Sequence, residues 1–215
     1  MSDSVQIDEL VQLAQLGVAT VYEASGRVGL IDIPLTQIVP GSRVAGPART
    51  VLCGQDDNLM VHAVLAEVQA GEVLVLTMPD PAPIALVGEL LATQALAHNV
   101  AAILVDAAVR DVEELRELGL PIWTRYVRVR GATKTRVGRI NDPVTVGGTV
   151  INPGDIVVLD ADGAAVVAQD RVAAAVEASR ARADRETRLR TQLQAGALSY
   201  DLHGLRAVIE GEGHS

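Results

Sequence analysis

The sequence predicts an α/β fold in which a mostly parallel sheet is covered by helices. Short apolar runs alternate with helical patterns between residues 72 and 124, which is typical of a parallel α/β layer. Val-rich segments broken by Gly and Pro follow over 126–168 and predict antiparallel hairpins. A long charged stretch, 170–196, predicts one solvated or subunit-bridging helix. We therefore expect a single α/β domain with N-terminal helices (1–169) and a C-terminal helical arm (170–215).

The individual elements follow from apolar spacing and from turn residues. Apolar side chains at helical spacing, with Thr, Asp or Asn at the start, predict the helices. Continuous or alternating apolar runs bounded by Gly and Pro predict the strands. Helices are expected over 8–15, 20–26 (capped by Thr20), 57–69 (capped by Asp57 or Asn58 and ended by Gly71), 86–98, 112–118 and 170–196. Strands are expected over 43–53 (interrupted at Gly46-Pro47), 72–78 and 100–106, with hairpin turns at Gly147-Gly148, Pro153-Gly154 and Asp162-Gly163.

Composition limits the classes of partner. Hydrophobic residues make up 49% of the chain but aromatic residues only 2%, so Val, Ala, Leu and Ile must form the core. Acidic residues outnumber basic ones by 27 to 18, which disfavours a nucleic-acid partner because the surface repels phosphates and offers few rings for stacking. The acidic N-terminus does not resemble a signal peptide, and no apolar run is long enough to span a membrane. A cytoplasmic protein is the expectation.

Several kinds of catalytic site are not supported by the residues available. With Cys53 as the single cysteine there is no Cys-x-x-Cys pair for zinc, and the four histidines lack metal-binding spacing. Neither a nucleophile elbow nor a phosphate-binding glycine loop occurs. A Schiff-base mechanism would need Lys134, the only lysine, which we expect in an exposed hairpin where nothing lowers its pKa.

A carboxylate site for a hard cation remains. Arg110 and Asp111 stand where the strand ending at 106 passes into a helix, and ligands bind at the carboxyl ends of strands in α/β layers. An aspartate there can hold Mg²⁺ while waters and substrate oxygens complete the octahedron, and the arginine can bind an enolate oxygen. The structural alternative is that Asp111 and Glu114 form a capping box and that Arg110 makes a surface ion pair.

A second candidate lies in the first turn of the helix that follows the Pro-rich loop 79–83. Free backbone N–H groups from Gly88 onward can receive a substrate carboxylate, and Glu89 can hold a metal-bound water. The alternative is that Glu89 only complements the helix dipole and that Leu90 and Leu91 belong to the core.

In order and spacing, these segments resemble one enzyme family. It is the family of 4-hydroxy-4-methyl-2-oxoglutarate and 4-carboxy-4-hydroxy-2-oxoadipate aldolases, in the superfamily of the regulator of ribonuclease activity A. The resemblance runs over nearly the whole chain, and the late PGD…DxDGxxVV pattern is particularly specific. It rests on VPGSRVAGPARTVLC at 39–53, DNLMVHAVLAEVQAGEVLVL at 57–76, GELL at 88–91, DAAVRD at 106–111, PGDIVVLDADGAAVV at 153–167 and R-x-x-R-E at 182–186.

The resemblance implies a fold, an activity and an assembly. The fold would be a layered α/β/β sandwich resembling swivelling phosphohistidine-type domains, with a long C-terminal helix. The activity would be aldolase cleavage of an oxo acid to pyruvate through an enolate, with Mg²⁺ or Mn²⁺ as cofactor and oxaloacetate decarboxylation as a side activity. A small 2-oxo acid would be the substrate, and the assembly would be a homotrimer or homohexamer. The alternative is a non-catalytic protein regulator, although that branch tends to lack the acidic metal set that this chain retains. A third possibility, a methyltransferase, lacks a glycine-rich nucleotide loop.

The resemblance also implies a role for each matching residue. They are Asp111 as the direct metal ligand, Arg110 on the keto oxygen, Glu89 on a metal-bound water, the Leu90 and Leu91 amides on the pyruvate carboxylate, and Glu186 as an acid contributed across a subunit interface. Two departures concern the substrate side of the site. Asp106-Ala107-Ala108 stands where the family commonly has Asp-Gly, and the loop 79–83 is rich in Pro instead of Gly.

Overall fold

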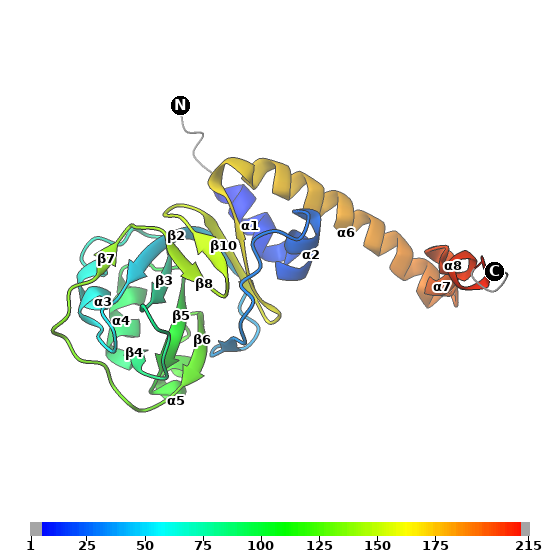
Figure 1. Cartoon of the computed structure of the whole chain (residues 1–215). Coiled ribbons are helices and arrows are strands. Elements are labelled where there is room, and N and C mark those ends of the chain that lie inside the picture. The colour runs from blue at the N-terminus through cyan, green and yellow to red at the C-terminus, as the bar shows by residue number, and fades with distance from the viewer. Residues whose placement is uncertain (1–5, 212–215) are drawn as a thin grey trace.

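A computed structural model describes residues 6–211 and shows a nine-stranded mixed sheet within the body from which the helical arm extends (Figure 1). The strand order is β1-β6-β5-β3-β2-β10-β11, with β4 beside β5 and β7 beside β2. Pairing is parallel from β2 through β3 and β5 to β6, which confirms the predicted parallel layer. The strands are β1 (Thr36–Gln37), β2 (Val44–Leu52), β3 (Val73–Thr77), β4 (Ala85–Val87), β5 (Ala102–Val109), β6 (Ile122–Val127), β7 (Arg139–Ile140), β10 (Ile156–Asp160) and β11 (Gly163–Val167). A separate hairpin pairs β8 (Val144–Val146) with β9 (Thr149–Ile151).

The two faces of this sheet carry different cover, which confirms a layered α/β/β arrangement. Every residue of β3 and β5 is buried, as expected for strands of a parallel sheet covered on both faces. Asp106, the one charged residue of these strands, pairs with Arg125 at 3.0 Å. On one face the two strands pack against α3 (Leu59–Val64), α4 (Glu89–Ala97) and α5 (Val112–Leu118). On the other face they pack with Trp123 against the β8–β9 hairpin and β10.

A third core cluster joins the N-terminal helices to the C-terminal one. Here α1 (Ile7–Leu16), α2 (Val18–Ala24) and the start of α6 (Val172–Gln194) pack against β10 and β11. Thr20 was predicted to cap the second helix, and that prediction is wrong. The helix begins at Val18, whose N–H donates to Asp160 Oδ2 at 2.9 Å. Gly17 permits this approach because it has φ +82° and because a Cβ there would lie 2.7 Å from the same carboxylate oxygen.

Other predicted boundaries shift for local reasons. The helix expected over 57–69 ends at Val64 in a series of turns, and the segment 85–87 is strand β4 before α4 begins at Glu89. Gly46-Pro47 does not interrupt β2, since Pro47 pairs with Ile156 of β10 within a continuous antiparallel register. The predicted hairpin around Lys134 is wrong, because residues 128–138 form an irregular loop between β6 and β7.

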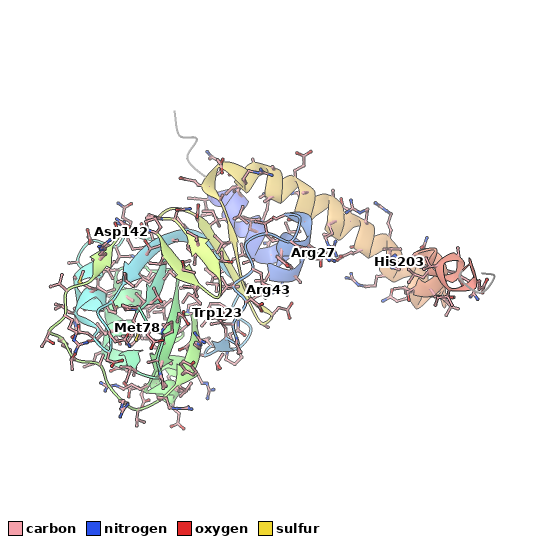
Figure 2. All side chains as sticks on the ribbon, in the orientation of Figure 1. Arg27, Arg43, Met78, Trp123, Asp142 and His203 are labelled. Carbon is pink, nitrogen blue, oxygen red and sulfur yellow. The ribbon has the colours of Figure 1, made fainter. Side chains whose placement is uncertain are left out.

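The long C-terminal helix is confirmed, and its far half leaves the body of the protein (Figure 1). Two short helices, α7 (Ser199–Leu202) and α8 (Leu205–Gly211), end the arm and were not predicted. The side chains near His203 lie far from the sheet in the same view (Figure 2). None of the helices within residues 6–211 is both long and apolar enough to cross a membrane.

Candidate active site

The site begins at the carboxyl end of β5, where Asp111 turns the chain into α5. Asp111 takes a left-handed conformation, φ 60° and ψ 46°, which Asp tolerates better than most residues. Its side chain does not cap its own helix, so the capping-box alternative for Asp111 and Glu114 is wrong. Instead Asp111 Oδ2 accepts a hydrogen bond from the backbone N–H of Glu89 at 3.1 Å. This contact brings the end of β5 against the start of α4.

Arg110 lies beside this carboxylate in a space that two glycines leave open. Its Nε is 3.5 Å from Asp111 Oδ2, and its side chain is 49% exposed. A Cβ on Gly88 would lie 2.5 Å from Asp111 Oδ2 and 3.1 Å from Arg110 Nε, and a Cβ on Gly131 would lie 3.0 Å from Arg110 Nη1. A side chain at Gly88 would therefore displace the Arg110–Asp111 pair, whereas one at Gly131 would crowd only the end of the Arg110 side chain.

The first turn of α4 supplies backbone donors at the same place. Gly88 is the N-cap, and within the described chain the N–H groups of Leu90 and Leu91 have no hydrogen-bond partner. The Leu91 side chain is buried in the core, whereas that of Leu90 is 81% exposed. The Glu89 carboxylate is turned along the helix surface, where its Oε1 accepts from Thr93 Oγ1 at 3.0 Å.

A cavity of 170 Å³ connects these groups. The predicted residues Gly88, Leu90, Leu91, Arg110 and Asp111 all line it, whereas the side chain of Glu89 stands outside its wall. The cavity also has residues that sequence reasoning missed. They are Asn58, His62, Ala85, Leu86, Gly131, Ala132 and Lys134.

Three of the missed residues bring polar groups. Asn58 and His62 stand four residues apart around α3, a spacing that places both on one helix face and that the sequence could have revealed. Asn58 Nδ2 donates to the Leu86 carbonyl at 2.9 Å, while its buried Oδ1 has no hydrogen-bond partner among residues 6–211. Lys134 arrives from the irregular loop, so the only lysine of the chain borders the cavity.

Asp111 is the one carboxylate residue that lines this cavity. No group of three or more His, Cys, Asp or Glu side chains within the described chain is arranged to hold a metal. The donor set fits a hard cation such as Mg²⁺, which commonly takes one or two protein carboxylates and keeps several waters. Asp111 Oδ1 accepts no hydrogen bond from residues 6–211 and is open to such an ion.

Glu186 does not join this cluster within one chain. It lies on α6, where its carboxylate pairs with Arg182 at 2.8 Å, and Arg182 in turn reaches Glu23 at 3.7 Å. A larger hollow of 330 Å³ lies nearby between α2, β11 and α6, with Ser25 and Arg171 as its polar lining residues. That hollow has no carboxylate in its wall, so the chemistry described here belongs to the smaller cavity.

The fold and this site define an α/β protein with an Arg-Asp pair and helix N-terminal donors at the strand ends. A family model described as "RraA-like: Aldolase/RraA" matches residues 18–166. The chain belongs to this family.

Two relatives and one further protein of the same fold are similar to this chain. A Halalkalibacterium halodurans protein named "Putative 4-hydroxy-4-methyl-2-oxoglutarate aldolase" is 30% identical over 206 residues, which is 95% of each chain. Streptomyces coelicolor RraAS2, described as an unusual member of the RNase ES inhibitor RraA protein family, is 30% identical, with a TM-score of 0.75 over 87% of this chain and 98% of its own. An uncharacterized protein from Pseudomonas syringae pv. tomato has the same fold, with a TM-score of 0.81 at 24% identity over 92% of this chain and 93% of its own.

Proposed function

We propose that the chain is a divalent-metal-dependent aldolase that releases pyruvate from 4-hydroxy-2-oxo acids of the 4-hydroxy-4-methyl-2-oxoglutarate type. One observation carries the proposal. Arg110, Asp111 and the free amides of the first turn of α4 converge on a single cavity at the carboxyl end of β5. The relationship to a protein named as an aldolase of this type supports the same reading.

Different residues around the cavity would bind different groups of a 2-oxo acid. The Leu90 and Leu91 amides would receive the carboxylate, because N–H groups at a helix N-terminus favour an anion. Asp111 would hold Mg²⁺ or Mn²⁺, which when bound polarises the 2-oxo group and supplies positive charge for an enolate. Arg110 would donate to the keto oxygen as it becomes negative, in an orientation already set by Gly88 and Gly131.

The cleavage needs one base, which removes a proton from the C4 hydroxyl, and one proton, which is added at C3. The C4 hydroxyl loses its proton, C4 becomes a carbonyl, and the electron pair of the C3–C4 bond moves into the pyruvate enolate. Protonation at C3 then gives pyruvate. Glu89 would hold the water that takes the hydroxyl proton, for which it must leave its exposed hydrogen bond with Thr93. Oxaloacetate would pass through the same enolate on losing CO₂.

Lys134 suits the second carboxylate of a diacid substrate. It lines the cavity, and no hydrogen bond or ion pair to another described residue occupies its amine. A diacid held at one end by the α4 amides would therefore meet a positive charge near the other end. A flexible ammonium is suited to binding a carboxylate without fixing its orientation.

Glu186 would act from a neighbouring subunit of a homotrimer or homohexamer. It stands on a helix whose far half extends away from its own body, as an arm that reaches another copy would (Figure 1). Mixing two inactive variants tests the arrangement, since Glu186→Gln subunits and Asp111→Asn subunits would form some complete sites together. Recovery of activity on mixing supports a shared site. Active monomers by light scattering would refute it.

The function itself is tested by pyruvate release from a small panel of oxo acids. The panel would contain 4-hydroxy-4-methyl-2-oxoglutarate, 4-carboxy-4-hydroxy-2-oxoadipate and oxaloacetate, each with chelator, Mg²⁺ or Mn²⁺. We expect metal-dependent release, with the hydroxy diacids preferred over oxaloacetate. Release from none of them, together with tight binding to an RNase E-type ribonuclease, would favour the regulator alternative suggested by the RraAS2 relationship.

A further inference from the structure

Asp57 is a fully buried carboxylate close to the cavity that no step above uses. It is 0% exposed and lies directly before Asn58, at the start of α3. Its Oδ1 accepts from the Leu59 N–H at 2.8 Å. Its Oδ2 accepts from Thr133 Oγ1 at 2.6 Å, from the Thr135 N–H at 2.6 Å and from the Arg136 N–H at 3.1 Å. One side chain therefore joins α3 to a segment more than 75 residues away in the chain.

The segment that Asp57 binds is the irregular loop that carries Lys134. Residues 128–138 contain no helix or strand, so the loop has no ladder of its own to hold Lys134 in place. Near Lys134 it is secured by the Asp57 contacts, by the Asn58 N–H to Thr133 carbonyl and Thr133 N–H to Asp56 carbonyl hydrogen bonds, each at 2.9 Å, and by Arg136 Nη1, which donates to the Gln55 carbonyl at 3.0 Å. The donors at Thr133, Thr135 and Arg136 surround Lys134 in sequence, so Asp57 fixes the loop on both sides of it.

The same carboxylate also holds the start of α3, which contributes to the lining of the cavity. The Leu59 N–H contact shapes the first turn of α3, from which Asn58 and His62 enter the lining. Burial by itself raises the pKa of Asp57, but hydrogen bonds from Thr133 and from three backbone amides outweigh it and hold the pKa below its usual range. The group is therefore ionised at neutral pH and accepts from all its donors at once.

We infer that Asp57 is a positioning residue that sets the distance between Lys134 and the Arg110–Asp111 pair, and so determines the affinity for the distal carboxylate of the substrate. The inference rests on the aldolase proposal, because it assigns Lys134 to that carboxylate. Asp57 touches neither the reacting atoms nor the metal ligand. Its effect passes through the loop and should appear in diacid binding more than in enolate formation.

The test compares Asp57→Asn with Asp155→Asn. Asp155 is also a buried aspartate that ties a turn together, with Oδ2 accepting from Asn152 N–H at 2.8 Å and Oδ1 from Gln169 N–H at 3.3 Å, and it does not line the cavity. In either variant an amide NH₂ replaces one acceptor and opposes an N–H donor, so both should melt at a lower temperature. The diagnostic quantity is the ratio of two rates, diacid cleavage as kcat/KM and exchange of pyruvate methyl protons with D₂O. Exchange needs the enolate site but has no distal carboxylate.

We expect Asp57→Asn to lower this ratio by roughly tenfold, mainly through KM, as for the loss of one charged contact. Asp155→Asn should leave the ratio within about twofold of wild type. In a Lys134→Ala background, Asp57→Asn should lower the ratio little further, because its effect passes through the lysine. Thr133→Val removes a single donor to Asp57 and provides a milder variant should Asp57→Asn not fold.

The possible failures are distinguishable. An unchanged ratio in Asp57→Asn and Thr133→Val, with wild-type cleavage and exchange both present, overturns the positioning role alone. Equal reductions in Asp57→Asn and Asp155→Asn assign the effect to stability and also overturn it. Absence of both reactions in the wild-type protein overturns the aldolase proposal, and the role of Asp57 falls with it.

Discussion

Replacing Arg110 by alanine separates catalysis from stability. The guanidinium makes one ion pair within the described chain, to Asp111 at 3.5 Å, and the two side chains are 49% and 39% exposed. Exposed pairs of this kind contribute about 0–1 kcal/mol to the free energy of unfolding. In a chain of this size 1 kcal/mol corresponds to a Tm change of about 2–4 °C. We therefore expect Arg110→Ala to melt within a few degrees of the parent.

The catalytic effect should be far larger. If Arg110 donates to the developing enolate oxygen, its loss removes a preorganised charged donor, which typically lowers turnover by ~10²–10³. The assay is exchange of pyruvate methyl protons with D₂O, because it reports enolate formation without the aldol step. Arg139→Ala is the matched control, since Arg139 makes a comparable exposed pair with Asp142 at 3.3 Å and does not line the cavity.

Two results would contradict this role of Arg110. Exchange at the parental rate in Arg110→Ala, together with a Tm many degrees lower, would mean that Arg110 supports the structure and does not touch the enolate. Slow exchange in Arg139→Ala as well would point to a general loss of charge and not to a site effect.

Three further predictions concern the surroundings of the site. Gly88→Ala should abolish most activity at near-parental Tm, because its φ of −136° suits Ala while the new Cβ would lie 2.5 Å from Asp111 Oδ2. In the control Gly46→Ala the nearest atom is a backbone oxygen at 2.7 Å, so this variant should lower Tm and leave kcat/KM unchanged. The reverse pattern would refute the steric argument. Borohydride with pyruvate should not inactivate the protein, and covalent trapping on Lys134 by mass spectrometry would replace the metal mechanism with an imine. Burial raises the pKa of the Cys53 thiol to about 12, so iodoacetamide should label it only as fast as the protein unfolds, and labelling at the rate of an exposed thiol would contradict the buried placement.

The elements that could be predicted are those specified by residues close together in the sequence. β3 and β5 contain the continuous apolar runs 73–76 and 102–105, and α5 follows directly from its spacing, so the parallel layer could be predicted. Arg110 and Asp111 could be placed at the end of β5 for the same reason. They meet the start of α4 at this edge of the sheet, and their role in binding a ligand stays a prediction.

The parts that could not be predicted depend on partners distant in sequence. Asp111 has a local capping-box partner in Glu114 but accepts instead from Glu89, 22 residues away. α2 begins one residue after Gly17 because Asp160, 142 residues from Val18, accepts from its first amide. No local pattern encodes either choice, since both depend on how strands and helices pack.

The cavity residues that the sequence did not reveal also depend on partners distant in the chain. Lys134 was expected on an exposed hairpin because its neighbours are polar. It is exposed, as expected, but the hairpin is absent and the position of Lys134 beside the cavity was not predicted. In the folded chain Asp57 binds those neighbours and brings the loop to the cavity. A buried aspartate before a helix has an ordinary capping role in any sequence, so its second role appears only once the loop is placed against it.

The most direct test of the central claim measures pyruvate release from 4-hydroxy-4-methyl-2-oxoglutarate against Mn²⁺ concentration, in chelator-treated wild type and in Asp111→Asn. Asn suits this comparison because it tolerates the φ of 60° at this position and its amide oxygen can still accept from the Glu89 N–H. The account predicts that metal-stripped wild type releases no pyruvate and that Mn²⁺ restores release in a saturable way. A folded Asp111→Asn protein should stay inactive even at about tenfold higher Mn²⁺ than saturates the wild type. Full activity without metal, or the same Mn²⁺ dependence in both proteins, would contradict it.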